Sequence, residues 1–446
     1  ADLSATSDYW NAVSALLAQF DGIVAGYAAR AEMSDGSLPA RTSLDWLWVN
    51  LDGDLFDLQS AVGSDDGISK LGRMGRASRQ FEDRTTPNYD GSAHVTPNGL
   101  RCSSLFKLTD DNDLFFGHDT WDTYATAAPR IWKYMTLPTR QKGSAVMRTI
   151  SFSSSPGFIS SVDDYYVIKG AGGGGAAASE TTTTGAPGGG PSKATSLVVI
   201  ETSLSIYNST AYEAVTPESV LYYLRVMAAS YLASTPADFQ EIYSIEASGT
   251  YNNQWQVLDL NGYNKNGAAE GGEGRVLADG SFVVFEEVPG LIYGKDMSQF
   301  LEEQRYWPSF NVVYFNETRA ISGETASYTD AVRARLFREM QGNVSDDASM
   351  KWMMAWNDYA NDPITSSPRG AIMARYDLSP NNPLAWVGGG IDSKYSSATH
   401  VTSTGASFAR AGPTRDDQPP FCWTAEFAET PHVGHPDCFV FDWGEF

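Results

Sequence analysis

Apolar residues recur every three or four positions from Trp10 to Met33, which predicts an amphipathic helix within a helical region that runs to about residue 70. Residues 74–100 are polar and rich in turn-forming residues, and they predict an exposed loop. From residue 102 the pattern changes to alternation. Residues 102–108 and 112–118, joined around the polar segment TDDND, predict a β-hairpin.

The rest of the chain mixes strand-like and helix-like segments. Helices are expected at residues 120–135, 216–234 and 348–362, the second of them capped by Thr216 with Glu218 in its first turn. Strands are expected at residues 144–154, 163–170, 195–204, 250–260, 280–294 and 307–315, followed by a loop-rich tail. No repeat of 20 to 50 residues recurs, and strands grouped between helices indicate an α+β protein rather than a doubly wound parallel sheet.

Residues 170–193 form a low-complexity stretch of Gly, Ala and Thr. Its glycines do not follow the GxxxxGK[ST] order of a phosphate-binding loop, so a flexible insertion is the better interpretation. Because it separates two strand-like segments, it is expected at the tip of a hairpin.

Composition sets the class of partner. The chain has 446 residues, 42% of them hydrophobic, and a formal net charge of -23, which argues against nucleic acid and against charge-driven docking on an anionic membrane. No membrane-spanning segment is expected, because Gln19 and Asp21 interrupt the apolar stretch 11–29. Integral membrane contact is therefore not expected either.

Three sequons, at Asn208, Asn316 and Asn343, together favour a secretory protein and predict glycosylation. The segment ADLSATSDYW carries no cleavable signal, and the numbering is expected to begin at a mature terminus. The expected location is outside the cell, or in a lysosome or acidic vacuole.

The chain has three cysteines. Cys422 and Cys438 lie 16 residues apart and can close a local disulfide in an oxidising compartment, which leaves Cys102 over. Cys102 is either a small buried apolar residue or a nucleophile. If the bond after Arg101 is cut, the α-amine of Cys102, with a reference pKa of about 8, becomes a built-in base for its own thiol.

The sequence gives little support for a calcium site, a zinc site or a serine-hydrolase elbow. The acidic segments NLDGDLFDL and TDDNDLFFG lack the glycine position and the closing Glu of a calcium loop, and solvated turns are expected there. The five histidines form no HExxH, and His432 and His435 have no evident third ligand for zinc. A GxSxG elbow is missing from the sequence. No cofactor and no metal are expected.

The chain resembles the phospholipase B-like (lamina-ancestor) family of the N-terminal nucleophile hydrolase superfamily. The resemblance runs from about residue 95 to the C-terminus and rests on motifs in one order: RCSSLFKL, NDLFFGHDTWDTY, SFSSSPGFISSVDDYYVI, SGTYNNQWQVLDL, YWPSFNVVYF, ASMKWMMAWNDYANDP, GGIDSKY and AGPTRDDQPPF. It implies a four-layer αββα fold, with two stacked antiparallel sheets between helical layers. It also implies a cut before Cys102 that leaves a mostly helical fragment, 1–101, attached to a hydrolase core, 102–446.

The resemblance further implies a set of site residues. Cys102 matches the nucleophile, while His118 and Trp121 match a GHxxW segment that lines the site. Thr202 matches a pocket threonine, and Asn311 matches an asparagine suited to donate to the oxyanion. Arg333 matches an arginine that orients the nucleophile or binds an anionic group, although Arg335 and Arg338 lie near enough for a shifted match. Trp121 and His118 have a purely structural alternative as buried core residues.

The sequence also departs from the family pattern. The family's cysteine pair near the NDP segment is missing from NDPITSSPRGAI, which supports a replacement disulfide between Cys422 and Cys438. A second cut within residues 170–193 remains open, as does trimming at Arg101 by an outside protease.

The leading hypothesis is an acyl hydrolase that deacylates glycerophospholipids through Cys102. One alternative is an amidase acting on N-acylated lipids, amino acids or peptides, and another is a catalytically idle binding or storage glycoprotein. The expected partners are a lipid or acyl-amide substrate and the chain's own cleaved fragments, with a homo-oligomer left open.

Overall fold

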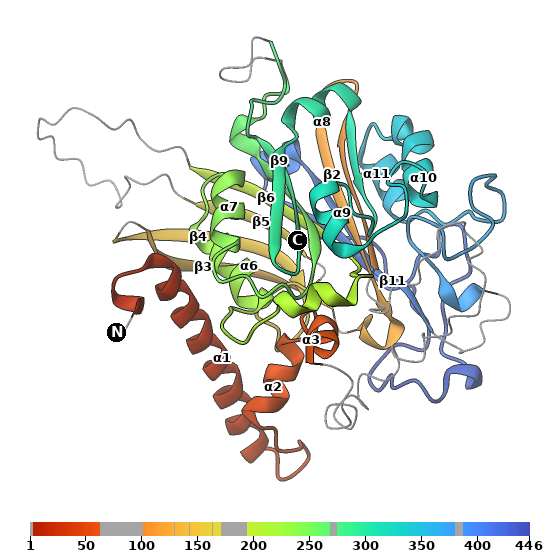
Figure 1. Cartoon of the computed structure of the whole chain (residues 1–446). Coiled ribbons are helices and arrows are strands. Elements are labelled where there is room, and N and C mark those ends of the chain that lie inside the picture. Colours follow the sequence, from red (N-terminus) through yellow and green to blue (C-terminus); the bar gives the residue numbers. More distant parts are fainter. Residues whose placement is uncertain are drawn as a thin grey trace, which may run out of the picture.

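The computed structural model describes residues 3–62, 101–128, 130–141, 143–162, 164–170, 194–267, 274–379 and 387–446, without the side chain of Arg101 (Figure 1). The loop expected at residues 74–100 and nearly all of the insertion 170–193 lie outside these ranges. The strands that flank the insertion, β5 and β6, pair antiparallel, so the insertion does join two neighbouring strands as expected.

The first sheet contains β1, the strand that begins at Arg101. Its strand order is β10-β1-β2-β11-β12-β13, and every neighbouring pair is antiparallel. The bounds are β1 Arg101–Leu108, β2 Leu114–Thr123, β10 Tyr306–Ser309, β11 Gly388–Ser397, β12 Phe408–Ala411 and β13 Gly444–Glu445. The antiparallel pairing of β1 with β2 confirms the hairpin predicted from the sequence.

The second sheet runs in chain order, β3-β4-β5-β6-β7-β8-β9, and is also antiparallel throughout. The bounds are β3 Ile131–Gln141, β4 Ser144–Ser154, β5 Tyr165–Gly170, β6 Thr195–Ser203, β7 Asn253–Asp259, β8 Phe282–Val288 and β9 Leu291–Asp296. Side chains of both sheets, such as Phe106, Phe116, Val198 and Ile200, share one buried apolar cluster, so the two sheets stack face to face.

Helices cover the two outer faces (Figure 1). On the second sheet lie α1 (Asp8–Glu32), α6 (Tyr222–Leu232) and α7 (Pro236–Tyr243), while α10 (Val332–Met340) and α11 (Asp347–Met354) pack on the first sheet. The other helices are α2 (Ser43–Asn50), α3 (Leu55–Val62), α8 (Ser298–Gln304), α9 (Asn316–Ser322) and α12 (Ala398–Ser403), with short 3-10 turns between elements. The architecture is the four-layer α+β arrangement of an N-terminal nucleophile hydrolase fold, two stacked antiparallel sheets between helical layers.

Several expected elements differ from the structure in type or in extent. Residues 120–135 form the end of β2, a 3-10 turn and the start of β3 rather than a helix, because Ile131, Trp132 and their neighbours pair with β4 along its whole length. The strand expected at residues 307–315 ends at Ser309, and the helix expected at residues 348–362 ends at Met354. The tail contains β11, a fully buried central strand of mostly Gly, Ser and charged residues that shows no apolar alternation.

The helix expected from Thr216 begins only at Tyr222, and its N-cap Leu221 provides no side-chain cap. The backbone N–H of Tyr222 donates instead to Oδ1 of Asp54, 168 residues earlier in the chain. Asp54 therefore supplies the acceptor that a local capping residue would supply.

The acidic segment NLDGDLFDL is not solvated, contrary to expectation, because Asp54 and Asp57 are buried. Asp54 also accepts from Thr250 Oγ1, and Asp57 accepts from the Tyr212 hydroxyl and from the Asn252 side chain. These carboxylates bind the N-terminal helical segment to the rest of the protein.

By length and composition alone, α1 is long and apolar enough to cross a membrane, a test that soluble core helices and signal sequences also pass. In this structure one stripe of α1, including Tyr9, Ala12, Val13 and Leu16, is buried in the cluster that α6 also lines. At the other end of the chain, Cys422 and Cys438 form the expected disulfide.

Candidate active site

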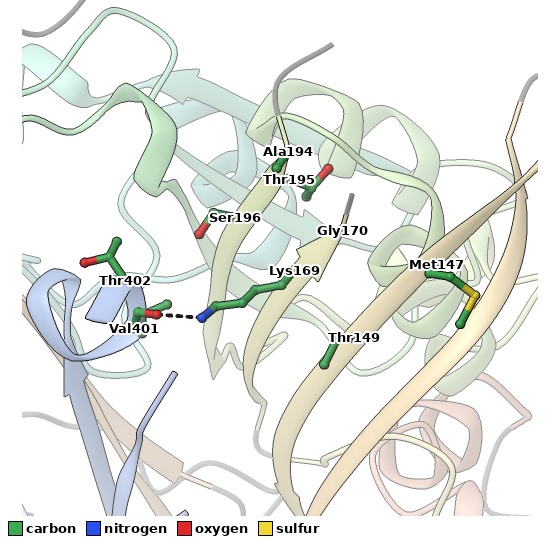
Figure 2. A pocket seen from close by; sticks show the side chains of 9 residues that line it. All are labelled: Met147, Thr149, Lys169, Gly170, Ala194, Thr195, Ser196, Val401 and Thr402. Atoms are coloured by element: carbon green, nitrogen blue, oxygen red, sulfur yellow. Dashed lines mark hydrogen bonds between the residues drawn. The ribbon is translucent and has the colours of Figure 1, made fainter. Parts of the chain in front are cut away.

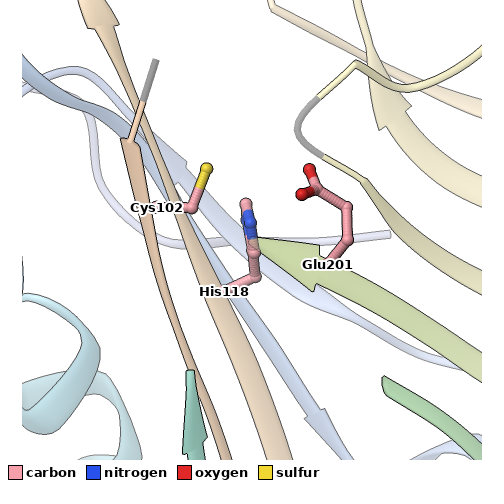
Figure 3. Close-up of side chains that lie close together, drawn as sticks. All are labelled: Cys102, His118 and Glu201. Carbon is pink, nitrogen blue, oxygen red and sulfur yellow. The ribbon is translucent and has the colours of Figure 1, made fainter. Parts of the chain in front are cut away.

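The β1–β2 hairpin brings Cys102 and His118 onto one face. Cys102 pairs with Thr120 and Ser104 pairs with His118, so these alternate residues point the same way, into the space between the sheets. Glu201 reaches the same place from β6 of the second sheet. The Cys102 sulfur, a ring nitrogen of His118 and a carboxylate oxygen of Glu201 all lie within 4.8 Å of one another, and all three residues are buried (Figure 3).

The backbone of Cys102 is held by two side chains. Its N–H donates to Oδ1 of Asn311 at 3.1 Å, and its carbonyl accepts from Nη1 of Arg333. Asn311 in turn donates through Nδ2 to the carbonyl of Ser203 at 2.7 Å. Asn311 has a φ of 69°, in the left-handed region that Asn tolerates better than most residues. This turn directly after β10 aims its amide at the start of β1.

Arg333, on the first turn of α10, is buried and connects several parts of the site. Besides Cys102 it donates to Ser103 Oγ, to the carbonyl of Phe310 and to Oδ1 of Asn311. Its guanidinium lies 4.4 Å from the ring centre of Trp121, a cation–π contact. Arg335 and Arg338 are exposed, so within this helix Arg333 is the arginine that contacts Cys102.

His118 is fully buried. Neither of its ring nitrogens makes a hydrogen bond of standard geometry within the described residues, although the backbone of Glu201 lies beside the ring. Burial, reinforced by the nearby charge of Lys394, lowers the pKa of His118 well below its ordinary value. The imidazole is therefore neutral and carries a lone pair between the thiol and the carboxylate.

Lys394 is a buried cation on β11 directly opposite His118 in the sheet. Its ammonium donates to Oγ1 of Thr120 and to Oδ1 of Asp392, each at 2.6 Å. Arg130 binds the other oxygen of Asp392 at 2.8 Å. Although burial opposes ionisation, these two cations hold the pKa of Asp392 below its usual value.

Thr202 is also buried, and its hydroxyl shares a 2.5 Å hydrogen bond with Ser309 of β10, the strand beside β1. It therefore joins the two sheets at the same end as Glu201. Among the expected residues, Arg333 contacts Cys102, Asn311 and Trp121. His118 lies close to Cys102, and Thr202 is connected to this group through Ser309 of β10. Their catalytic roles stay predictions.

Two residues of this site were missed in the sequence. Glu201 accepts from the backbone N–H of Asp164 and from the Tyr251 hydroxyl while pointing at His118. For Glu201 the available signal was a single charge within the apolar segment VVIETS, and for Lys394 it was the neighbouring opposite charge of Asp392 in GGIDSKY. Charges in buried strands have to be paired, and they mark functional or structural networks.

An open hollow of about 380 Å³ lies elsewhere, near Lys169, Thr195 and Val401 (Figure 2). Thr195 begins β6, whereas Glu201 and Thr202 are near its other end. The hollow and the site around Cys102 therefore lie at opposite ends of this strand. Lys169 also donates to the carbonyl of Val401 across it.

Among the sequons, Asn316 and Asn343 are exposed and Asn208 is half-buried. The Asn208 side chain accepts from Thr210 of its own sequon. Glycosylation of these residues stays a prediction.

Comparisons with known proteins agree on one family. Residues 1–446 match the family model described as Phospholipase B. Phospholipase B-like protein A of Dictyostelium discoideum is 31% identical over 459 residues, covering 98% of this chain and 71% of that protein. Phospholipase B-like 1 of Bos taurus is 31% identical over 446 residues (97% and 70%), and that of Homo sapiens is 30% identical over 451 residues (98% and 70%).

Proposed function

The chain belongs to the phospholipase B family, and from that premise we propose that it is an acyl hydrolase whose nucleophile is the thiol of Cys102. The proposed substrates are glycerophospholipids, in keeping with the printed names of the relatives. The observation that carries the proposal is the set of contacts around Cys102. Asn311 accepts a hydrogen bond from its backbone N–H, Arg333 donates one to its carbonyl, and neutral His118 lies close to its thiol.

The proposed reaction begins with a cut of the Arg101–Cys102 bond, which divides the chain into 1–101 and 102–446. The new α-amine takes the thiol proton while sulfur attacks the ester carbonyl. Collapse of the tetrahedral intermediate breaks the bond to the alcohol, which leaves with that proton. Water then attacks the thioester, the amine again relays the proton, and the fatty acid departs.

The surrounding residues have distinct proposed roles. Asn311 keeps the amine beside the thiol through Oδ1, and Arg333 fixes the same asparagine and the Cys102 carbonyl. Trp121 supports the Arg333 guanidinium. An oxyanion role for Asn311 requires Nδ2 to exchange the Ser203 carbonyl for the substrate oxygen. Thr202 sits at the interface of the sheets as a second candidate for contact with the acyl group.

The proposed location is outside the cell or in a lysosome or acidic vacuole. The Cys422–Cys438 disulfide supports an oxidising route, and the exposed sequons at Asn316 and Asn343 are compatible with it. Burial also raises the pKa of Asp54 to about 7, so the carboxyl is mostly protonated, and its burial less costly, in an acidic medium.

The test begins with the chain itself. Terminal sequencing of protein from its native source should find a fragment beginning at Cys102, and Cys102→Ala should remain uncut if cleavage is autocatalytic. Mature-sized fragments from Cys102→Ala would assign the cut to another protease. An intact native chain would remove the α-amine base and leave an idle glycoprotein.

The bond class needs its own measurement. An ester and an amide with the same acyl chain should be compared on cleaved wild-type protein and on Cys102→Ser, which retains a weaker nucleophile. Faster turnover of the ester supports the lipase function. A large preference for the amide would replace it with an amidase.

A further inference from the structure

Three side chains meet at one buried point from three different strands. Cys102 comes from β1, His118 from β2 and Glu201 from β6, and Figure 3 shows the imidazole between the thiol and the carboxylate. Their ligand atoms are within 4.8 Å of one another. The acyl-transfer scheme uses the thiol but gives the Glu201 carboxylate nothing to do.

His118 supplies a second, independent observation. Both ring nitrogens are buried and make no standard hydrogen bond within the described part of the chain, which is uncommon for a fully buried imidazole. The ring is aimed into the space between Cys102 and Glu201. A buried neutral imidazole with an available lone pair is the commonest metal ligand in proteins.

We propose that Cys102, His118 and Glu201 form an inhibitory binding site for a thiophilic divalent cation of the zinc class. Thiolate sulfur, imidazole nitrogen and carboxylate oxygen are the three ligand types that Zn²⁺ takes. Hard cations such as Ca²⁺ and Mg²⁺ prefer sets of oxygen ligands. Ligands of a tetrahedral zinc ion lie about 3.5 Å apart, so closure around the ion needs side-chain shifts of about 1 Å.

Binding converts the nucleophile into a ligand. The thiol proton is released to solvent, the sulfur lone pair is donated to the metal, and no covalent bond of the chain is broken. A bound cation therefore blocks attack by Cys102. The blocking effect rests on the proposed function, but the site does not, since the three side-chain donors are present in the uncut and the cut chain alike.

The probe is Co²⁺, whose thiolate complexes absorb through a charge-transfer band, with Zn²⁺ added in competition. Wild-type protein should bind one Co²⁺ per chain with a thiolate band, and Cys102→Ser should lose the band. Glu201→Gln and His118→Gln should each weaken binding by about tenfold or more, since even the loss of an outer-shell partner costs a metal site about that much. Zn²⁺ should raise the melting temperature of the wild type more than that of either variant.

The matched control is His432→Gln combined with His435→Gln, which removes a histidine pair next to Trp423, far along the chain from the site. This variant should keep full affinity and the thiolate band. Loss of binding in the control, no thiolate band in the wild type, or full affinity in both Glu201→Gln and His118→Gln would overturn the site.

Activity separates the two proposals. Metal-free protein that releases acyl groups but binds no Co²⁺ overturns the metal site alone. Protein that binds Co²⁺ through Cys102 but hydrolyses no acyl substrate when metal-free keeps the site and overturns the proposed function.

Discussion

The backbone N–H of Cys102 donates a 3.1 Å hydrogen bond to Oδ1 of Asn311, a residue 209 positions later in the chain. The same oxygen accepts from Arg333, and the amide nitrogen of Asn311 donates to Ser203. The orientation of this amide is thus fixed by partners on both its atoms. The nitrogen that becomes the base after a cut at residue 101 is already held in place before the cut.

Asn311→Ala should lower kcat by about a hundredfold, because a general base that is not held near the thiol loses most of its effect. Asn311→Asp keeps the acceptor but adds a negative charge beside the amine. That charge favours the protonated amine, raises its pKa and shifts the acid limb of the pH–rate profile to higher pH.

The pH dependence of kcat/KM for the two variants distinguishes the roles of Asn311. An alkaline shift with substantial activity in Asn311→Asp supports the holding of the amine. If Asn311→Asp is as inactive as Asn311→Ala at every pH, the Nδ2 donor is the essential atom, as an oxyanion role requires.

Arg333→Lys should lower activity by about a hundredfold or more. A single ammonium cannot reproduce the contacts to Cys102, Ser103 and Asn311 or stack on Trp121 as the planar guanidinium does. Arg335→Lys, two residues away on the exposed face of α10, is the control and should leave activity unchanged and stability within about 0.5 kcal/mol. Equal losses in both variants would contradict the assignment of Arg333.

Much of this fold could be predicted because its buried strands carry runs of apolar residues. Strands β5, β6 and β8 are such runs, and their side chains are buried on both faces of the sheet. β11 is buried on both faces as well, but it carries Gly390, Asp392 and Lys394 where an apolar residue would be expected. Lys394 and Asp392 have hydrogen-bond partners that are distant in sequence, Thr120 and Arg130 respectively. The local sequence pattern therefore does not reveal these contacts.

The start of α6 and the candidate site also depend on contacts between residues that are distant in sequence. Tyr222 is capped by Asp54, so no local capping residue exists to mark the first turn. The motif resemblance indicated Cys102, Asn311 and Arg333, and they contact one another. Glu201 was missed because its meaning depends on the stacking of one sheet on the other, which brings β6 opposite β1.

Lys394→Met should destabilise the protein by about 3 kcal/mol, because it leaves the buried Asp392 with Arg130 as its remaining cation. Asp392→Asn should also destabilise it, while the double variant should cost less than the sum of the two. Lys295→Met, on an exposed position of β9, is the control.

A spectroscopic signal tests the link from Lys394 to the site. Removal of its charge should raise the pKa of His118, since that charge acts with burial to lower it. The His118 resonances followed by NMR across pH measure this directly. An unchanged titration of His118 would mean that Lys394 is electrostatically isolated from His118. Strictly additive stabilities of the Lys394 and Asp392 variants would mean that those two residues are not coupled.

The buried carboxylate of Asp54 predicts how pH acts on the attachment of the N-terminal segment. Burial raises the pKa of Asp54 to about 7, against an ordinary value of 3.8, so the folded state binds this proton more tightly than the unfolded state. Its contribution to stability is complete below about pH 4 and is lost as pH rises through about 7. Asp54→Asn cannot ionise and keeps an acceptor for Tyr222 and Thr250, so its melting temperature should fall less than that of the wild type between about pH 5 and pH 8.

Thermal unfolding at both pH values, with Asp21→Asn on the exposed face of α1 as the control, measures the effect of Asp54 separately from that of the other titrating groups. In cut protein, release of the fragment 1–101 should follow the same order, because Asp54 lies on that fragment and its partners lie on the other. An identical pH dependence in the wild type and Asp54→Asn would show that Asp54 is already ionised in the folded protein at about pH 5, and the fragment would then be held by apolar contacts of α1 and by Asp57.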